Sequence, residues 1–195
     1  MTPEQVLTLF KETRALLEGH FQLTSGLHSP NYFQCARVLQ YPRYAEQLCG
    51  VIASHFLAAR PDAVVAPALG GIVVGQEVGR QLGVRTMFTE RKDGVMQLRR
   101  GFEIAPGERV LVCEDVVTTG GSVKEVIAIV KSLGGVVAGV GCIVDRSGGT
   151  AAFETDEKNA YIATLSMDVV TYRPEDCPLC KQGVPVTKPG SRGNV

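Results

Sequence analysis

The stretch that most constrains the fold is Val110–Ser122, which reads VLVCEDVVTTGGS. It opens with four apolar residues in a row, as is typical of a strand covered on both faces of a parallel sheet. Two carboxylates, Glu114 and Asp115, follow where such a strand is expected to end. Small residues then lead into a helix, in which Ser122 and Glu125 fit a capping box. The stretch therefore predicts a buried strand, an acidic pair, a tight loop and a helix, in that order.

This arrangement indicates an anion site with a cation site beside it. Free backbone N–H groups and the helix dipole favour a phosphate at the loop. The two carboxylates can bind ribose hydroxyls or a hydrated Mg²⁺, which prefers oxygen ligands. The alternative is a tight turn whose glycines serve only geometry and whose acids are solvated. The stretch is neither a P-loop, since GxxxxGK[ST] is missing, nor a dinucleotide fingerprint, since GxGxxG is missing.

A second unit of the same kind comes earlier in the chain. The apolar run Ala63–Ala66 is followed by Pro67–Gly71, and a helical apolar spacing continues over Ile72–Leu82. Its loop offers a second row of backbone amides for phosphate. Glycines in such a turn also occur for steric reasons alone, which is the alternative here.

The stretch Glu90–Gly101, ERKDGVMQLRRG, carries Arg91, Lys92, Arg99 and Arg100. One interpretation is a solvated basic loop. The functional interpretation rests on position, because the loop leaves the sheet edge where ligands of open α/β sheets bind. The 20 basic and 20 acidic residues of the chain cancel, so this cluster is its main local source of positive charge.

Arg146 follows the apolar run Val136–Val144 and stands at the expected carboxyl end of a central strand. A guanidinium there is well placed to bind a substrate carboxylate through two parallel hydrogen bonds. The alternative is a surface ion pair between Asp145 and Arg146, which contributes little energy.

These units predict an α/β fold with a mainly parallel central sheet flanked by helices and a small N-terminal hood. Strands are expected near residues 63–66, 84–89, 110–113, 136–144 and 161–165. An N-terminal helix is expected to start at Thr2, to include Leu16 and Leu17, and to close at Gly19 and His20. The 195 residues are expected to form one domain, with a helix and hood over 1–40, a core over 60–170 and a tail over 174–195.

Composition narrows the cellular setting and the partners. The balanced charge gives no sign of a nucleic-acid or membrane partner. Six cysteines, mostly without regular spacing, favour free thiols in a reducing compartment over a disulfide scaffold. With neither a secretory signal nor a membrane-spanning run in the sequence, a cytoplasmic protein is expected.

Three further features receive no role in the predicted site. A lone histidine in a turn, such as His28, is expected to be solvated, and no role is assigned to His55. Cys177 and Cys180 form half of a zinc motif, but no second CxxC or CxxH completes it, so a loop packed by two thiols is expected. The last six residues, 190–195, are expected to be disordered.

The string EDVVTTGGS, together with VDRS at 144–147, SGxxSPxYF at 25–33 and the Arg91-Lys92 pair, resembles the type I phosphoribosyltransferases, and among them the orotate phosphoribosyltransferases. The resemblance covers essentially the whole chain. It implies transfer of a phosphoribosyl group from phosphoribosyl pyrophosphate to orotate, giving orotidine 5′-monophosphate and pyrophosphate in pyrimidine (UMP) biosynthesis. It also implies Mg²⁺, held mainly through substrate and water, and a homodimer in which the loop Arg91–Gly101 reaches the neighbouring site.

The resemblance also implies roles for individual residues. The pyrophosphate would lie on Leu69, Gly70 and Gly71. Orotate would be held by Arg146 with Thr118. The catalytic residues would be Asp115, Arg91 and Lys92. The phosphoribosyl donor would be bound by Glu114, Asp115, Val116, Val117, Thr118, Thr119, Gly120, Gly121 and Ser122.

The sequence departs from the orotate pattern at several points. Relatives often have a lysine where Thr24 stands and another near Gly70, and longer relatives have a lysine and a histidine in the basic loop. Arg99 or Arg100 is the expected substitute for the loop residues. Two alternatives stay open: a purine-base phosphoribosyltransferase, and a non-catalytic regulator that senses the donor on the same fold.

Overall fold

The computed structural model describes residues 1–23, 25–157 and 160–189. Its centre is a six-stranded sheet in the order β5-β4-β3-β6-β7-β8, parallel except for the antiparallel pair β4–β5. The predicted fold class is confirmed. The strands are β3 (Ala63–Pro67), β4 (Arg85–Lys92), β5 (Val95–Leu98), β6 (Arg109–Val117), β7 (Val136–Asp145) and β8 (Tyr161–Ser166).

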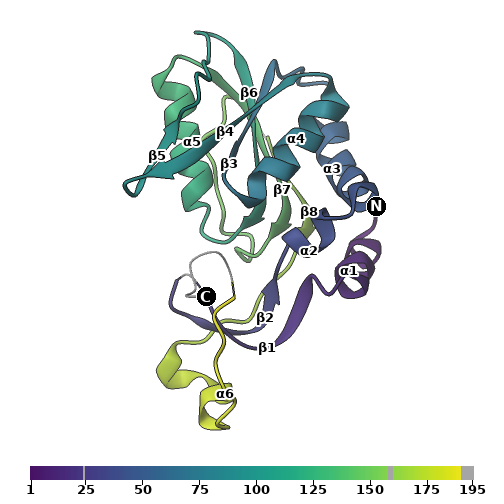
Figure 1. Ribbon diagram of the computed structural model, residues 1–195, viewed down its shortest axis with the longest axis vertical. Coiled ribbons are helices and arrows are strands. Elements are labelled where there is room, and N and C mark those ends of the chain that lie inside the picture. The colour runs from purple at the N-terminus through teal and green to yellow at the C-terminus, as the bar shows by residue number, and fades with distance from the viewer. Residues whose placement is uncertain (24, 158–159, 190–195) are drawn as a thin grey trace.

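Helices cover both faces of this sheet (Figure 1). One face packs against α1 (Pro3–Glu12), α2 (Ala36–Leu39), α3 (Pro42–Phe56) and α4 (Gly70–Leu82), and the other against α5 (Gly121–Ser132). A hydrophobic core lies on each face of the sheet, and alternate residues of β6 point into the two cores. Leu111 packs toward α3 and α4, whereas Val110 and Val112 pack toward α5. The apolar run of β6 therefore reflects burial on both faces, as the sequence predicted.

The hood lies below the sheet in Figure 1 and consists of β1 (Leu16–Gln22) paired antiparallel with β2 (His28–Phe33). The prediction of one helix through Leu17 was wrong. Helix α1 ends at Glu12, and Arg14 takes a φ of 53°, so the chain turns and continues as a strand that contains Gly19 and His20. The spacing of Leu16 fitted a helix, but its burial comes from strand pairing with Phe33.

The basic stretch after β4 is a hairpin and not an irregular loop. Strand β4 runs on to Lys92, beyond the predicted end at residue 89, and pairs with β5. Asp93 and Gly94 both have positive φ, at 53° and 81°, as a two-residue type I′ turn requires. The Asp-Gly pair is thus a hairpin signal that the prediction of a loop overlooked.

The C-terminal segment crosses the hood. It contains the 3₁₀ turn η1 (Pro174–Asp176) and the short helix α6 (Pro178–Lys181), and Thr187 forms a parallel bridge with Phe21. The expectations for Thr24 and for residues 190–195 lie outside the described residues. Within the described part of the chain, no helix combines the length and the apolar character needed to cross a bilayer.

Two glycines of β7 let α3 pack closely on the sheet. A Cβ atom at Gly139 would overlap the Phe56 ring and lie 2.9 Å from the Ala160 carbonyl oxygen. A Cβ at Gly141 would overlap the side chain of Ile52. Neither contact leaves room for even a methyl group.

We expect Gly139→Ala to lower the free energy of unfolding by about 1–3 kcal/mol, the usual cost of overpacking a core. The matched control is Gly50→Ala, in α3, because a Cβ there would meet only the end of the Gln81 side chain. Gly50→Ala should leave stability unchanged or raise it by up to about 1 kcal/mol. Denaturant unfolding measures both, and equal stabilities for the two variants would contradict this packing.

Candidate active site

A cavity of about 790 Å³ opens at the carboxyl ends of β3 and β6. The loop after β3, the end of β6 and the start of α5 form its floor, and Gln22, Ser25 and Tyr32 line it from the hood. Among the residues predicted for the site, Leu69, Gly70, Arg91 and the whole of Glu114–Ser122 line this cavity.

The loop into α5 differs from its prediction in one informative way. The expected capping box does not form: the N-cap residue is Gly120 with a φ of 74°, and no side chain caps the helix. Ser122 is instead the second residue of α5, and Glu125 binds the Nη2 atom of Arg91 at 2.6 Å. The first N–H groups of a helix have no partner within it, so those of α5 stay available at the cavity. This is the arrangement that binds a phosphate.

The acidic pair lies within β6 and not after it, because the strand continues to Val117. Glu114 is only 8% exposed, and its Oε1 accepts a hydrogen bond from the Asp115 amide at 3.0 Å. Burial, reinforced by the charge of Asp115, raises the pKa of Glu114 well above its ordinary value. Glu114 therefore holds a proton more tightly than a solvated glutamate does.

The glycine loop after β3 closes onto these two acids. A Cβ at Gly70 would overlap the Asp115 carboxylate, and a Cβ at Gly71 would lie 3.1 Å from Glu114 Oε1. Glycine at both positions is what allows the backbone to approach the acids. Helix α4 starts at Gly70 and its N-cap, Leu69, makes no side-chain cap, so a second uncapped helix start faces the cavity. Gly71 itself lies behind Gly70 and does not line the cavity.

The predicted loop cations do not all reach the cavity. Arg91 lines it, held by Glu125 and by the Gly94 carbonyl at 2.8 Å. Lys92, Arg99 and Arg100 do not line it. The guanidinium groups of the last two bind the Glu90 carboxylate, at 3.2 and 2.9 Å.

Arg146 lies directly behind the cavity. Its backbone N–H donates to Val117, which lines the cavity, and its guanidinium lies 5.6 Å from the centre of the Phe33 ring. Burial lowers its pKa, and its buried Nε atom has no hydrogen-bond partner in the described part of the chain. The alternative of a surface pair with Asp145 was wrong, because Asp145 is buried and its Oδ1 accepts from the Ser147 amide at 2.7 Å. Arg146 is not among the residues that line the cavity, and its buried Nε is a donor whose missing partner calls for an explanation.

Sequence reasoning missed part of the cavity wall. Gln22 and Tyr32 come from the hood, and Lys188 and Pro189 come from the C-terminal tail. The tail is held against β1 by Thr187, whose N–H donates to the His20 carbonyl at 2.8 Å. These residues lie more than 150 positions apart in the chain, so no local pattern could have paired them.

The sequence model described as "Phosphoribosyl transferase domain" matches residues 37–170, which is more than half of the chain. The chain therefore belongs to the phosphoribosyltransferase family, as its resemblance predicted. Full-length relatives narrow this to the orotate branch: the orotate phosphoribosyltransferase of Chlorobium phaeobacteroides is 57% identical over 194 residues, covering 100% of this chain and 98% of the relative.

Solved structures agree on the fold and leave the base open. The crystal structure of orotate phosphoribosyltransferase from Aeropyrum pernix superimposes with a TM-score of 0.68 at 24% identity, covering 83% of this chain and 93% of that one. An adenine phosphoribosyltransferase from Rhodothermus marinus gives a TM-score of 0.67 at 18% identity, covering 84% and 99%. Such similarity shows a shared fold and does not by itself distinguish between the bases.

The burial of Glu114 predicts that the stability of the protein depends on pH. Glutamate in the unfolded protein has a pKa of about 4.3, and the pKa of Glu114 is higher than this in the folded protein. Below about pH 4.3 the group is protonated in both states and its burial costs nothing. As the pH rises from about 4.3 toward the folded pKa, the folded protein loses stability relative to the unfolded protein. Glu114→Gln cannot ionise and keeps the acceptor for the Asp115 amide. We therefore expect Glu114→Gln to melt about 2–4 °C above the unsubstituted protein at pH 8, the shift that roughly 1 kcal/mol produces in a chain of this size. Near pH 4 the two should melt together.

Glu154→Gln is the matched control, since its side chain is 89% exposed and should change the melting temperature at neither pH. A difference for Glu114→Gln that does not vary with pH would contradict the burial of an acid at this position.

Proposed function

We propose that this protein transfers the phosphoribosyl group of phosphoribosyl pyrophosphate to orotate, giving orotidine 5′-monophosphate and pyrophosphate in pyrimidine biosynthesis. The observation that carries the choice of base is the buried, unpartnered Nε of Arg146 behind a cavity with two uncapped helix starts. The names of the full-length relatives support the same activity.

The starts of α5 and α4 bind different phosphate groups of the donor. The loop Thr118–Ser122 holds the 5′-phosphate on its free amides, and Leu69–Gly71 holds the pyrophosphate. Glu114 and Asp115, between the two loops, hold the ribose hydroxyls. The close packing of Gly70 and Gly71 against these carboxylates supports the assignment, because it fixes the distance between the two anion sites.

The reaction needs stabilisation of charge more than acid–base chemistry. The bond from C1′ of the ribose to the pyrophosphate oxygen breaks and C1′ gains oxocarbenium character. N1 of orotate forms the new bond to C1′ and releases its proton to solvent. Asp115 lies on the cavity floor, where a carboxylate stabilises positive charge that develops on the ribose. The rest of the rate enhancement comes from holding the two reactants in line.

The charge of the cavity supports a role for Mg²⁺. Among the described residues, its lining contains two cations, Arg91 and Lys188, and three acids, Glu114, Asp115 and Glu125. This lining alone does not neutralise a pyrophosphate. The oxygen ligands of Asp115, the substrate and water suit Mg²⁺, which when bound would offset the charge of the leaving pyrophosphate.

The hairpin β4–β5 supplies the remaining cations. Lys92, Arg99 and Arg100 lie outside the cavity of their own chain. We propose that the protein acts as a homodimer in which this hairpin reaches the neighbouring cavity. There Lys92 and the other cations outside their own cavity would close over the pyrophosphate and exclude water, and Lys92 would act on the leaving group together with the Arg91 that lines that cavity.

Arg146, with Thr118, fixes orotate through its carboxylate. A purine base has no carboxylate and does not need a buried guanidinium, which argues against the purine-base alternative. A non-catalytic regulator could keep the donor cavity and lose the hairpin cations, so the presence of all four argues against it.

We expect Arg146→Ala to reduce kcat/KM for orotate by about 10- to 100-fold, which corresponds to the roughly 1.5–3 kcal/mol of a hydrogen bond to a charged group. Turnover of uracil, which lacks the carboxylate, should change little, so the preference for orotate over uracil should collapse. Steady-state kinetics with the two bases measures this ratio.

Arg80→Ala is the matched control, because Arg80 is exposed on α4 and binds Glu46 and Glu77 away from the cavity. It should leave both rates unchanged. Unaltered orotate turnover in Arg146→Ala would refute the assignment of orotate to this guanidinium.

A further inference from the structure

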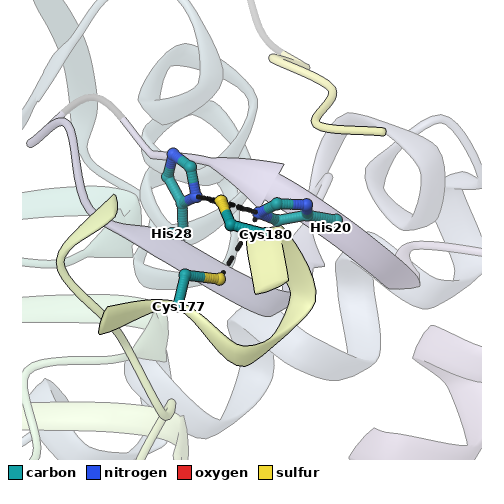
Figure 2. Close-up of side chains that lie close together, drawn as sticks. All are labelled: His20, His28, Cys177 and Cys180. Carbon is teal, nitrogen blue, oxygen red and sulfur yellow. Dashed lines mark hydrogen bonds between the residues drawn. The ribbon is translucent and has the colours of Figure 1, made fainter. Parts of the chain in front are cut away.

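Two histidines of the hood and two cysteines of the tail meet outside the donor cavity (Figure 2). We call these four residues the hood–tail cluster: His20 on β1, His28 on β2, and Cys177 and Cys180 at α6. Each offers one ligand atom, and these atoms all lie within 4.8 Å of one another. The expectation of a solvated His28 was wrong, since His28 is 6% exposed.

Three of the distances between these atoms match the edges of a small tetrahedron. His20 Nε2 lies 3.5 Å from Cys177 Sγ and 3.7 Å from Cys180 Sγ, and His28 Nδ1 lies 3.3 Å from Cys180 Sγ. Zinc bound to two thiolates and two imidazoles requires ligand–ligand distances of about 3.3–3.8 Å. The 2.8 Å between His20 Nε2 and His28 Nδ1 is shorter than this range, and the four atoms spread over up to 4.8 Å, so the side chains must shift slightly to admit an ion.

The hydrogen bonding of His20 prepares it as a ligand. Its Nδ1 lies 2.7 Å from the Val184 carbonyl oxygen, which can only accept, so Nδ1 carries the proton. The lone pair then resides on Nε2, which faces the other three ligand atoms. A backbone carbonyl that fixes the tautomer in this way is the usual second partner of a metal-binding histidine.

We propose that the hood–tail cluster binds a structural zinc ion. Two thiolates and two imidazoles suit Zn²⁺, whereas Mg²⁺ prefers oxygen. Binding releases the two thiol protons to solvent, so two thiolates and one Zn²⁺ leave the cluster neutral. Four protein ligands fill a tetrahedral site and leave no open position, which makes the ion structural and not catalytic.

The zinc ion would fasten a segment that has little else to hold it. From Arg173 to Val186, Cys177 is the one residue that is buried. The next residues pair with β1: Gln22 N–H donates to the Thr187 carbonyl at 2.8 Å, and Lys188 then lines the donor cavity. The ion thus secures the segment that brings Lys188 to the substrate, a consequence that rests on the proposed function.

Metal analysis of the purified protein tests the proposal without any assay of activity. We expect about one zinc per chain, and replacement by Co²⁺ should give the visible bands of tetrahedral cobalt and a thiolate-to-cobalt charge-transfer band. Cys180→Ser and His28→Gln should each lower the zinc content at least about tenfold. Cys180 is exposed, so its substitution does not disturb the core.

His55→Gln is the matched control, because His55 is exposed on α3, and it should bind zinc normally. A zinc-selective chelator should speed tryptic cleavage after Lys181 in the unsubstituted protein but not in Cys180→Ser. Wild-type protein that binds no zinc when supplied with it, zinc content unchanged in Cys180→Ser, or a Cys177–Cys180 disulfide in its place would overturn the proposal. Because metal content does not depend on turnover, this result stands whatever the outcome for orotate.

Discussion

The site depends on the contact between a glycine backbone and two acids. Gly70 lies so close to Asp115 that no side chain fits between them, and a Cβ at Gly71 would lie only 3.1 Å from Glu114 Oε1. This contact joins the start of α4 to the end of β6, and so sets two uncapped helix starts on either side of one cavity. Burial keeps the Glu114 pKa high, which costs stability near neutral pH. The structure thus holds a carboxyl group between the two loops that are proposed to bind the phosphates of the donor.

The local units could be predicted from the sequence because their signals are local. Apolar runs predicted the central strands, and the string around Glu114 predicted the buried strand, the loop and the helix that follows it. The errors arose where one signal fits two structures. Ser122 and Glu125 satisfy the spacing of a capping box, but Glu125 gains a charged partner in Arg91, and Gly120 takes the N-cap position. Leu16 fits the spacing of a helix, although pairing with Phe33 makes it part of a strand.

The long-range parts of the structure had no such signal. His20 and Cys177 are 157 positions apart, and only the folded hood brings them together. The tail that carries Lys188 into the cavity crosses the same hood. The hood thus forms one wall of the cavity and supplies two ligands of the proposed zinc site. Through the tail, a zinc ion there would also position Lys188 in the cavity wall. The absence of a second CxxC or CxxH from a sequence is therefore weak evidence against a metal site, since the other two ligands can come from any segment.

The central claim is that this cavity joins a phosphoribosyl donor to a base that carries a carboxylate. The most direct test supplies phosphoribosyl pyrophosphate and Mg²⁺ with orotate, uracil, adenine or guanine in parallel, and follows the absorbance of each base. We predict loss of orotate absorbance, with pyrophosphate released in equal amount and little change for the other bases. Turnover of adenine or guanine in preference to orotate, or donor binding without turnover of any base, would contradict this claim.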